Sequence, residues 1–284
     1  MKNTNNKDNN SNKNGKNIPK SDKISRMDRY NNLDNDIKDT VTLRDAYSWD
    51  EEKGLKNKQD IVVVEQICEF YKNEEYKGKV LASPNGLKEL LVGHIISEGN
   101  FKKDEKIKEI KIIEESDEIE GLKNRKIIKL KLYTESNDLN EIKTGNDLNL
   151  KLSTIKKIMV QMPTMSNIWE LTGGVHWAGL FDMEGNKLTY YEDIGRHNAI
   201  DKVIGYAKIN GLDISNCIIV SSGRQPTAMV KKAVNAGCSV IITKSPSTNH
   251  GIDLANKEKI ILLGFARINR FMIYSGLEYI NFEE

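Results

Sequence analysis

The sequence predicts an α/β protein in which helices cover both faces of a largely parallel sheet. Apolar runs of strand length alternate with helical segments in its last third: 217–220, 226–236, 238–243, 252–256 and 260–264. Strands that read as continuous apolar runs are typical of parallel sheets buried on both faces. Pro226 and Gly237 stand where helices commonly begin and end. The order β-α-β-α-β therefore predicts parallel strands joined by right-handed crossovers.

A hairpin and a helix precede this repeat. Residues 176–181 and 187–191 are strand candidates that flank "DMEGN", which has the composition of a turn. A helix is predicted over 199–207. Its apolar face consists of Ile200, Val203, Ile204 and Ala207.

A smaller α+β unit is predicted further upstream. Residues 61–71 are a strand candidate, and 83–99 suit an amphipathic helix. The apolar stripe of that helix is formed by Leu87, Leu90, Leu91 and Ile95. Residues 106–115 and 125–135 have the pattern of two strands joined by a glycine-containing turn.

We therefore divide the chain into three parts. Residues 1–25 are almost entirely Asn, Lys, Asp and Ser, which cannot offset their ordering entropy by burial, so they predict a disordered tail. Residues 26–150 form an N-terminal region that includes the small α+β domain, and 151–284 form the α/β core.

Composition limits the classes of function. The 43 basic and 41 acidic side chains nearly cancel, which argues against a nucleic-acid-binding protein that works by bulk charge. No apolar run approaches the roughly 18–20 residues of a membrane helix, and no signal peptide is recognised, so a cytoplasmic protein is expected. The three cysteines include no C-x-x-C pair and the four histidines no H-x-x-x-H pattern, so no metal site is expected.

Polar segments follow the three predicted parallel strands: "SSGR" (221–224), "KSPST" (244–248) and "FARINR" (265–270). Right-handed crossovers bring the carboxyl ends of parallel strands to one edge of a sheet, where ligands of open α/β sheets bind. Ser222, Gly223 and Arg224 have a phosphate-binding composition. Arg267 and Arg270 suit phosphates or a planar, carbonyl-rich ring. We therefore predict a ligand site at this edge.

Two further motifs carry reactive or charged side chains. In "TGGVH" (172–176), Gly173 and Gly174 allow a ligand to approach the backbone, and His176 is a candidate base or hydrogen-bond donor. In "EDIGRHNAIDK" (192–202), the candidate ligand-binding residues are Glu192, Asp193, Arg196, His197, Asn198 and Lys202. Asn198 is also suited to cap the helix predicted to begin at 199. The spacing leaves two interpretations open: an anion clasp at a helix N-terminus, or a turn whose charges pair with one another.

The stretches "TGGVHWAGLF", "YEDIGRHNAIDKVIG", "SSGRQPTAMVKKAVNAG" and "LLGFARINRFMIYSG" resemble the FdhD family, sulfur carrier proteins needed for formate dehydrogenase activity. The resemblance covers about 60–90 and 150–280, and "EDIGRHNAIDK" is its most specific motif. It implies a cytidine deaminase-like α/β core, a smaller second domain and a homodimer.

The resemblance also implies a sulfurtransferase role. Such proteins take persulfide sulfur from a cysteine desulfurase and pass it to molybdenum, or tungsten, bis(molybdopterin guanine dinucleotide). This cofactor then enters the formate dehydrogenase apoenzyme. The family's cofactor-binding segment falls on Phe265, Ala266, Arg267, Ile268, Asn269 and Arg270.

The chain departs from this family at the persulfide cysteine. Members carry a C-G-x-C-G loop after the strands of the small domain, where this sequence reads "ESNDLNE" (135–141). Asn137 and Asn140 stand near the two cysteine positions, and an amide cannot carry a persulfide, which requires a thiolate. No catalytic residue is therefore assigned. The remaining cysteines lie in apolar segments and are expected to be structural: Cys68, Cys217 and Cys238.

Two functions stay open. The first is a sulfur carrier that acts on the cofactor before its insertion into formate dehydrogenase. The second is a non-catalytic chaperone that holds the cofactor and docks it to the apoenzyme.

Overall fold

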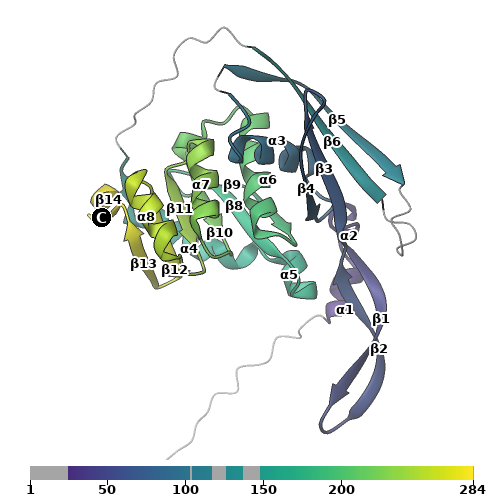
Figure 1. Ribbon diagram of the computed structural model, residues 1–284. Coiled ribbons are helices and arrows are strands. Elements are labelled where there is room, and N and C mark those ends of the chain that lie inside the picture. Colours follow the sequence, from purple (N-terminus) through teal and green to yellow (C-terminus); the bar gives the residue numbers. More distant parts are fainter. Residues whose placement is uncertain (1–24, 103, 117–125, 137–147, 284) are drawn as a thin grey trace, which may run out of the picture.

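The computed structural model describes residues 25–102, 104–116, 126–136 and 148–283. The predicted disordered tail, except for Ser25, lies outside these residues. The described chain contains a six-stranded sheet and a four-stranded sheet, with helices between and around them (Figure 1). No helix in the described ranges has the length and apolar composition needed to cross a lipid bilayer.

The larger sheet contains the predicted β-α-β-α-β repeat. Its strands, in order across the sheet, are β13 (Arg270–Ser275), β12 (Ile261–Arg267), β11 (Val240–Thr243), β10 (Cys217–Ser221), β8 (His176–Asp182) and β9 (Lys187–Asp193). β10, β11 and β12 are parallel, as predicted. β8 and β9 form the predicted hairpin, and β8 and β13 run antiparallel to the parallel strands beside them. The core is therefore a mixed α/β fold.

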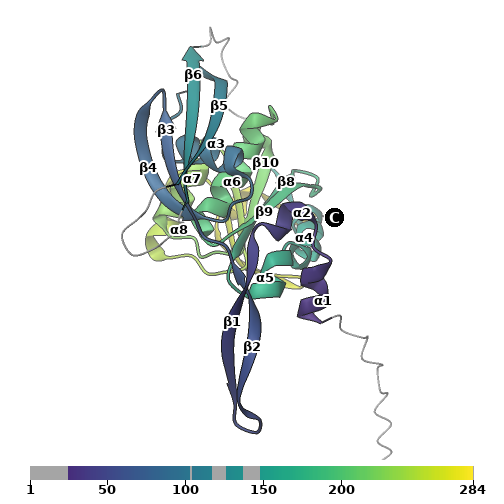
Figure 2. The ribbon, with the colours of Figure 1, turned by 90° about the vertical axis from the view of Figure 1, so that its right-hand side faces the viewer.

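Helices cover both faces of this sheet, which confirms the prediction (Figures 1 and 2). One face packs against α6 (Arg196–Ile209), α7 (Thr227–Ala236) and α8 (Asn249–Lys257). The other face packs against α4 (Leu152–Gln161) and the 3-10 helix η1 (Met162–Thr164). The remaining short elements of this half are β7 (Leu150–Lys151), α5 (Asn167–Thr172), η2 (Ile214–Asn216), η3 (Leu277–Tyr279) and β14 (Ile280–Asn281). Ile218 and Ile219 of β10 are fully buried in opposite layers, because successive side chains of a strand point to opposite faces.

The smaller sheet has the strand order β4-β3-β6-β5, and α3 (Leu87–Ser97) packs on one of its faces. Its strands are β3 (Gln66–Lys72), β4 (Glu75–Ala82), β5 (Glu105–Ser116) and β6 (Lys126–Ser136). The predicted helix and the strands predicted over 106–115 and 125–135 are confirmed. The single strand predicted over 61–71 is wrong, because the chain leaves one sheet at Val63 and enters another at Gln66.

α3 and α6 join the two sheets at a contact between glycines. A Cβ atom on Gly93 would lie 1.7 Å from the backbone oxygen of Asp201, and one on Gly205 would lie 1.9 Å from the backbone oxygen of Glu89. No side chain larger than hydrogen fits at either position without moving the helices apart.

Buried charges reinforce this contact. Asp201 is 1% exposed and accepts hydrogen bonds from Ser97 Oγ (2.6 Å) and Lys232 Nζ (2.9 Å). Its other carboxylate oxygen lies 3.2 Å from His94 Nδ1, and the His94 ring stacks on Phe70 with a centroid distance of 4.3 Å. The small sheet, α3, α6 and α7 therefore form one packed unit.

Residues 26–60, in which the sequence predicts no element, form two short helices and most of a long ribbon. The helices are α1 (Arg26–Asn31) and α2 (Asn35–Lys38). The ribbon consists of β1 (Val41–Asp50) and β2 (Gly54–Val63), paired antiparallel along their whole length. Its base packs against Ile168 and Leu171 of α5, whereas its outer half projects from the body (Figures 1 and 2). We call residues 41–63 the arm.

Candidate functional site

The three predicted strand-end segments lie side by side at one edge of the six-stranded sheet. Ser245 Oγ donates to the carbonyl oxygen of Ser222 over 2.7 Å, and the Lys244 amide donates to that of Ser221 over 3.0 Å. The Phe265 amide donates to the carbonyl oxygen of Ser245 over 3.2 Å. The predicted convergence is confirmed, and it follows from topology, because parallel strands end at the same edge.

The local structure of residues 265–270 differs from the prediction. We expected the strand to end at Gly264, but β12 continues to Arg267 and turns back directly into β13. Phe265 adopts a left-handed backbone conformation (φ 49°) at an irregularity in the pairing, which resumes between Arg267 and Arg270. The segment therefore forms the tip of a β-hairpin and not a loop that leads away from the sheet.

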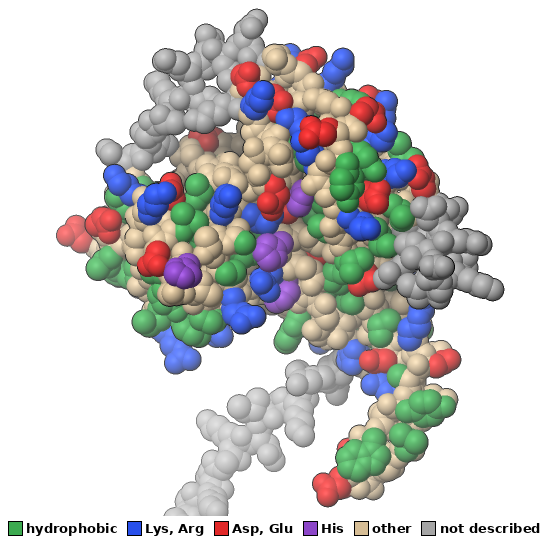
Figure 3. All heavy atoms as spheres, in the orientation of Figure 1, with side chains coloured by type: hydrophobic (Ala, Val, Ile, Leu, Met, Phe, Trp, Pro, Cys, Tyr) green, Lys and Arg blue, Asp and Glu red, His purple; other side chains and the backbone are tan. Residues whose placement is uncertain are grey.

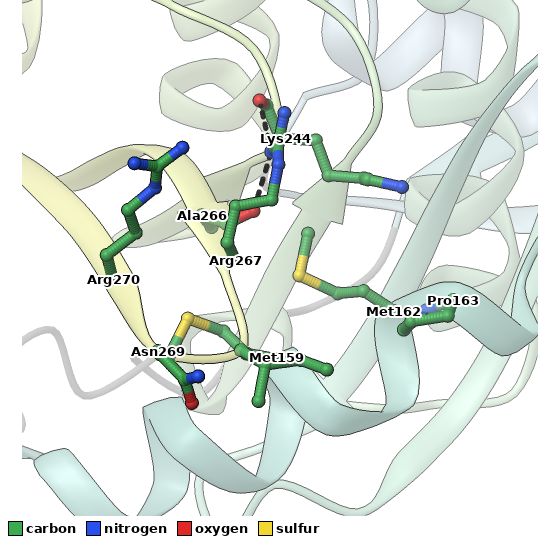
Figure 4. Close-up of a pocket in the computed structure, with 9 residues that line it drawn as sticks. Met159, Met162, Pro163, Lys244, Ala266, Arg267, Asn269 and Arg270 are labelled. Carbon is green, nitrogen blue, oxygen red and sulfur yellow. Dashed lines mark hydrogen bonds between the residues drawn. The ribbon is translucent and has the colours of Figure 1, made fainter. Parts of the chain in front are cut away.

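This hairpin tip, the end of α4 and η1 surround an open cavity of about 450 Å³. Its lining residues are Met159, Met162, Pro163, Lys244, Ala266, Arg267, Ile268, Asn269 and Arg270. Of the predicted cofactor-binding segment, all but Phe265 line it. Figure 4 shows the three basic side chains on one side of the cavity and the two methionines on the other. A concave site with an apolar wall and a few polar groups suits a small ligand.

The charge of the cavity favours an anion. Arg267 Nη1 donates to the carbonyl oxygens of Lys244 and Ala266, each over 2.8 Å, which fixes the guanidinium at the rim. Burial and then the charge of Arg267 lower the pKa of Lys244. No acidic residue is among the described residues that line the cavity. Guanidinium and ammonium groups so placed suit phosphate oxygens.

A second polar group lies at the same edge, beside β8. Ser222 Oγ accepts a hydrogen bond from the Trp177 amide (3.0 Å) and lies 3.3 Å from His176 Nδ1. Burial, and then the charges of Arg196 and Arg224, lower the pKa of His176, so its neutral form predominates near pH 7. The structure thus brings together predicted residues from three separate motifs.

Arg196 offers an unsatisfied donor within this group. Its side chain packs against Gly223, where an added Cβ would lie 2.9 Å from Arg196 Cβ. Its Nε atom is buried and has no hydrogen-bond partner within the described ranges. Because a buried N–H without an acceptor is costly, a ligand oxygen at this position would be stabilised.

Asp193, Asn198 and Lys202 lie deeper and pair with one another. Lys202 Nζ is 2.6 Å from Asp193 Oδ2, and both side chains are fully buried. Asp193 also accepts hydrogen bonds from Asn198 Nδ2 (2.8 Å) and the Gly195 amide (2.9 Å). α6 begins at Arg196, so Asn198 is not its cap, contrary to the prediction. For these three residues the structure matches the interpretation of a turn whose charges pair with one another.

Glu192 is also engaged within the protein. It is 3% exposed and accepts hydrogen bonds from the amides of Ile168 (2.8 Å) and Trp169 (2.9 Å) at the start of α5. Burial raises its pKa, although these hydrogen bonds oppose the rise. Glu192 therefore caps α5.

His197 and the glycine pair complete the predicted residues of these motifs. Burial, and then the charges of Lys232 and Arg196, lower the pKa of the half-buried His197. Gly173 ends α5 with φ 68°, and the position of a Cβ on Gly174 is 3.3 Å from Val63 of the arm. The glycines therefore serve a turn and a close packing contact.

Two further predicted positions, Asn137 and Asn140, lie outside the described residues. Conversely, no role was predicted for Met159 or Met162, which line the cavity, and Lys244 was predicted only as part of the strand-end segment 244–248. Lys244 directly follows a predicted parallel strand, and this position indicates a residue at the ligand-binding edge of the sheet. Nothing in the pattern of "IMVQMP" connects the two methionines with a site that lies more than 80 residues away along the chain.

All three cysteines are buried, as expected. Burial is the main cause that raises the pKa of Cys68 and Cys217 to about 12 and of Cys238 to about 11. Each thiol is therefore protonated near neutral pH and shielded from an incoming sulfur donor.

Comparisons with known proteins identify the family. The model of the FdhD/NarQ family matches residues 63–281. "Protein FdhD" of Methanocaldococcus jannaschii is 40% identical over 222 residues, which are 77% of this chain and 89% of that protein. "Sulfur carrier protein FdhD" of Wolinella succinogenes is 31% identical over 241 residues, with 79% and 84% covered. The crystal structure of a protein assigned as a formate dehydrogenase accessory protein from Desulfotalea psychrophila has a similar fold. Its TM-score is 0.70 at 23% identity, and the match covers 85% of this chain and 100% of that one. The chain therefore belongs to the FdhD/NarQ family.

Proposed function

We propose that this protein is a formate dehydrogenase accessory protein that binds molybdenum or tungsten bis(molybdopterin guanine dinucleotide) as its cargo and delivers it to the apoenzyme. The observation that carries the proposal is the basic cavity of about 450 Å³ at the sheet edge, lined by most of segment 265–270. The names of the relatives and the assignment of the structural neighbour support the same role.

The described residues fit part of such a cargo. Arg267, Arg270 and Lys244 provide positive charge for a diphosphate, and Met159 and Met162 offer a polarisable wall for a planar ring. Ligand pockets range from about 300 to 1,000 Å³ in volume, and this cavity of about 450 Å³ lies near the lower end of that range. We therefore assign it to one nucleotide arm of the cofactor and not to the whole cofactor. The unpartnered Nε of Arg196 marks a second place for an anionic oxygen.

Of the two forms of this function, the three buried thiols favour the chaperone. Carrying a persulfide requires a reachable thiolate, whereas burial raises the pKa of every cysteine in the chain to about 11 or 12. The name of the Wolinella relative favours the sulfur carrier, and with it a cysteine desulfurase as a partner. In our proposal this chain binds the cofactor without carrying sulfur on its own thiols.

The finer architecture belongs to the same proposal. We propose a cytidine deaminase-like core over 151–284 and a smaller domain within 26–150, which agree with the positions of the six-stranded and four-stranded sheets. We also propose that the protein is a homodimer and lies in the cytoplasm. The sedimentation coefficient of the purified protein tests whether it is a dimer.

Titration with GDP tests the cavity. The Arg267→Ala and Arg270→Ala variants should each weaken GDP binding by about tenfold or more, since each removes charge-assisted hydrogen bonds worth roughly 1.5–3 kcal/mol. Lys257→Ala, which removes a cation that is 78% exposed on α8, should leave the affinity unchanged. Equal affinities in all four proteins would reject the site.

Sulfur labelling tests the choice between the two forms. The purified protein is incubated with a cysteine desulfurase and labelled cysteine, and its mass is then measured under non-reducing conditions. We expect no protein-bound persulfide. A persulfide that disappears on substitution of one cysteine by serine would instead establish a sulfur carrier.

A further inference from the structure

The outer half of the arm presents an apolar face that no described part of the chain covers. Tyr47 and Trp49 are each 72% exposed and Leu55 is 68% exposed. Trp49 pairs directly with Leu55 across the two strands, and Tyr47 lies two residues before Trp49. Because side chains alternate along a strand, all three lie on one face of the ribbon.

The same face is buried at the base of the arm. Val41, Leu43, Ile61 and Val63 lie on it by the same alternation, and they pack in one cluster with α5. The opposite face carries Arg44, Lys56 and Lys58, and on the first face polar side chains separate the base from the tip: Asp45, Asn57 and Gln59. A difference in polarity between the two faces is typical of a strand pair that buries one face. Here the chain buries the apolar side chains at the base of the arm and leaves those of the outer half exposed.

The arm is rooted beside the candidate site. Val63 lies close to Gly174, where an added Cβ would be 3.3 Å from it, and Gly174 is two residues before His176 at the start of β8. Figure 3 shows hydrophobic side chains on the outer arm, and histidine and basic side chains near the centre of the same face of the molecule. A macromolecule that covered the apolar face would therefore also lie close to α5 and the start of β8.

The size of this face favours a transient contact. Three large side chains, about 70% exposed, offer roughly 400–500 Å². A standard stable interface buries about 800 Å² on each partner, so this face alone is too small for a permanent dimer.

We propose that the arm, through Tyr47, Trp49 and Leu55, is the docking element for the apoenzyme that receives the cargo. The inference rests on the proposed function and names the partner of the same site. The apoenzyme would contribute an apolar groove that takes up the three side chains during delivery, and it would leave once the cargo has moved.

The test measures binding of the purified formate dehydrogenase apoenzyme to the full-length protein. The triple variant Tyr47→Ser/Trp49→Ser/Leu55→Ser should bind the apoenzyme at least about tenfold more weakly, as expected for buried aromatic anchors. GDP affinity, the urea unfolding curve and the sedimentation coefficient should stay unchanged. The matched control is Arg44→Ser/Lys56→Ser/Lys58→Ser on the opposite face, which should bind like wild type.

A single variant distinguishes the loss of a docking side chain from local unfolding of the ribbon. Tyr47→Ser leaves the Trp49–Leu55 pair intact and should still weaken apoenzyme binding several-fold. Unchanged apoenzyme affinity in the triple variant would overturn the inference and leave the proposed function standing. A triple variant that sediments as a smaller species would assign the face to a second copy of the chain and also overturn it. If the wild-type protein itself did not bind the apoenzyme, the inference and the proposed function would fail together.

Discussion

Replacing Lys202 by methionine removes the cation from the most deeply buried ion pair in the described residues. Lys202 Nζ and Asp193 Oδ2 are 2.6 Å apart, and neither side chain is exposed. At an effective dielectric constant of about 20 the direct attraction over this distance is about 6 kcal/mol. Removing one partner of a buried pair typically costs about 3–5 kcal/mol, because the other charge stays buried.

We expect the lower end of this range, a loss of about 3 kcal/mol in the free energy of unfolding. The reason is that the Asp193 carboxylate keeps hydrogen bonds from Ser83 N, Asn198 Nδ2 and Gly195 N. Asp193→Asn should lower the free energy of unfolding by less than Lys202→Met does. Burial already lowers the pKa of Lys202, so without Asp193 the lysine can lose its proton and leave no buried charge.

Urea unfolding followed by circular dichroism measures these values, and the double variant completes a cycle. The control is Lys58→Met, since the Lys58–Asp60 pair is 3.4 Å apart and 48% and 37% exposed. This change should stay within about 0.5 kcal/mol. A coupling energy below about 0.5 kcal/mol between positions 193 and 202 would refute the reasoning.

Three further outcomes are expected. Although burial opposes it, the hydrogen bond with His94 and the charge of Lys232 lower the pKa of Asp201 below its ordinary 3.8. Its stabilising contribution is therefore complete above that pH and is lost as the pH falls through the lowered value. Asp201→Asn should flatten this acid limb of the stability profile, and an unchanged limb would contradict the assignment. Iodoacetamide at pH 8 should modify the three buried thiols only after denaturant is added, as mass spectrometry can check; rapid labelling of the native protein would be contrary evidence. Gly93→Ala should lower the free energy of unfolding by about 3 kcal/mol or abolish folding, because the new methyl would lie 1.7 Å from a backbone oxygen. Near wild-type stability in a urea titration would show that α3 and α6 can separate there.

The parallel part of the core was predictable because each of its strands is a short, continuous apolar run between helical segments. Once these strands are parallel, Ser222, Lys244 and Arg267 must meet at one edge. This is why the edge could be predicted as a ligand site from the sequence.

What could not be predicted depends on contacts between distant parts of the chain. Lys202 and Asp193 read as ligand-binding charges, yet Ser83, 110 residues before Asp193, completes their buried network. The outer arm has an apolar face too short and too interrupted by charge to read as paired strands. The bend at Phe265 depends on its tertiary setting, because few residues other than glycine adopt a positive φ.

The contact between Gly93 and Gly205 has a consequence for biosynthesis. During translation α3 leaves the ribosome more than 100 residues before α6, so the small sheet is made before the helix that covers the outer side of α3 exists. Until then Asp201 cannot accept the hydrogen bond of Ser97 or contact His94, and the side of Gly93 that meets α6 is uncovered. The N-terminal half of the chain is therefore an unfinished folding unit that waits for the C-terminal half, and a nascent chain stalled between them would be a substrate for chaperones.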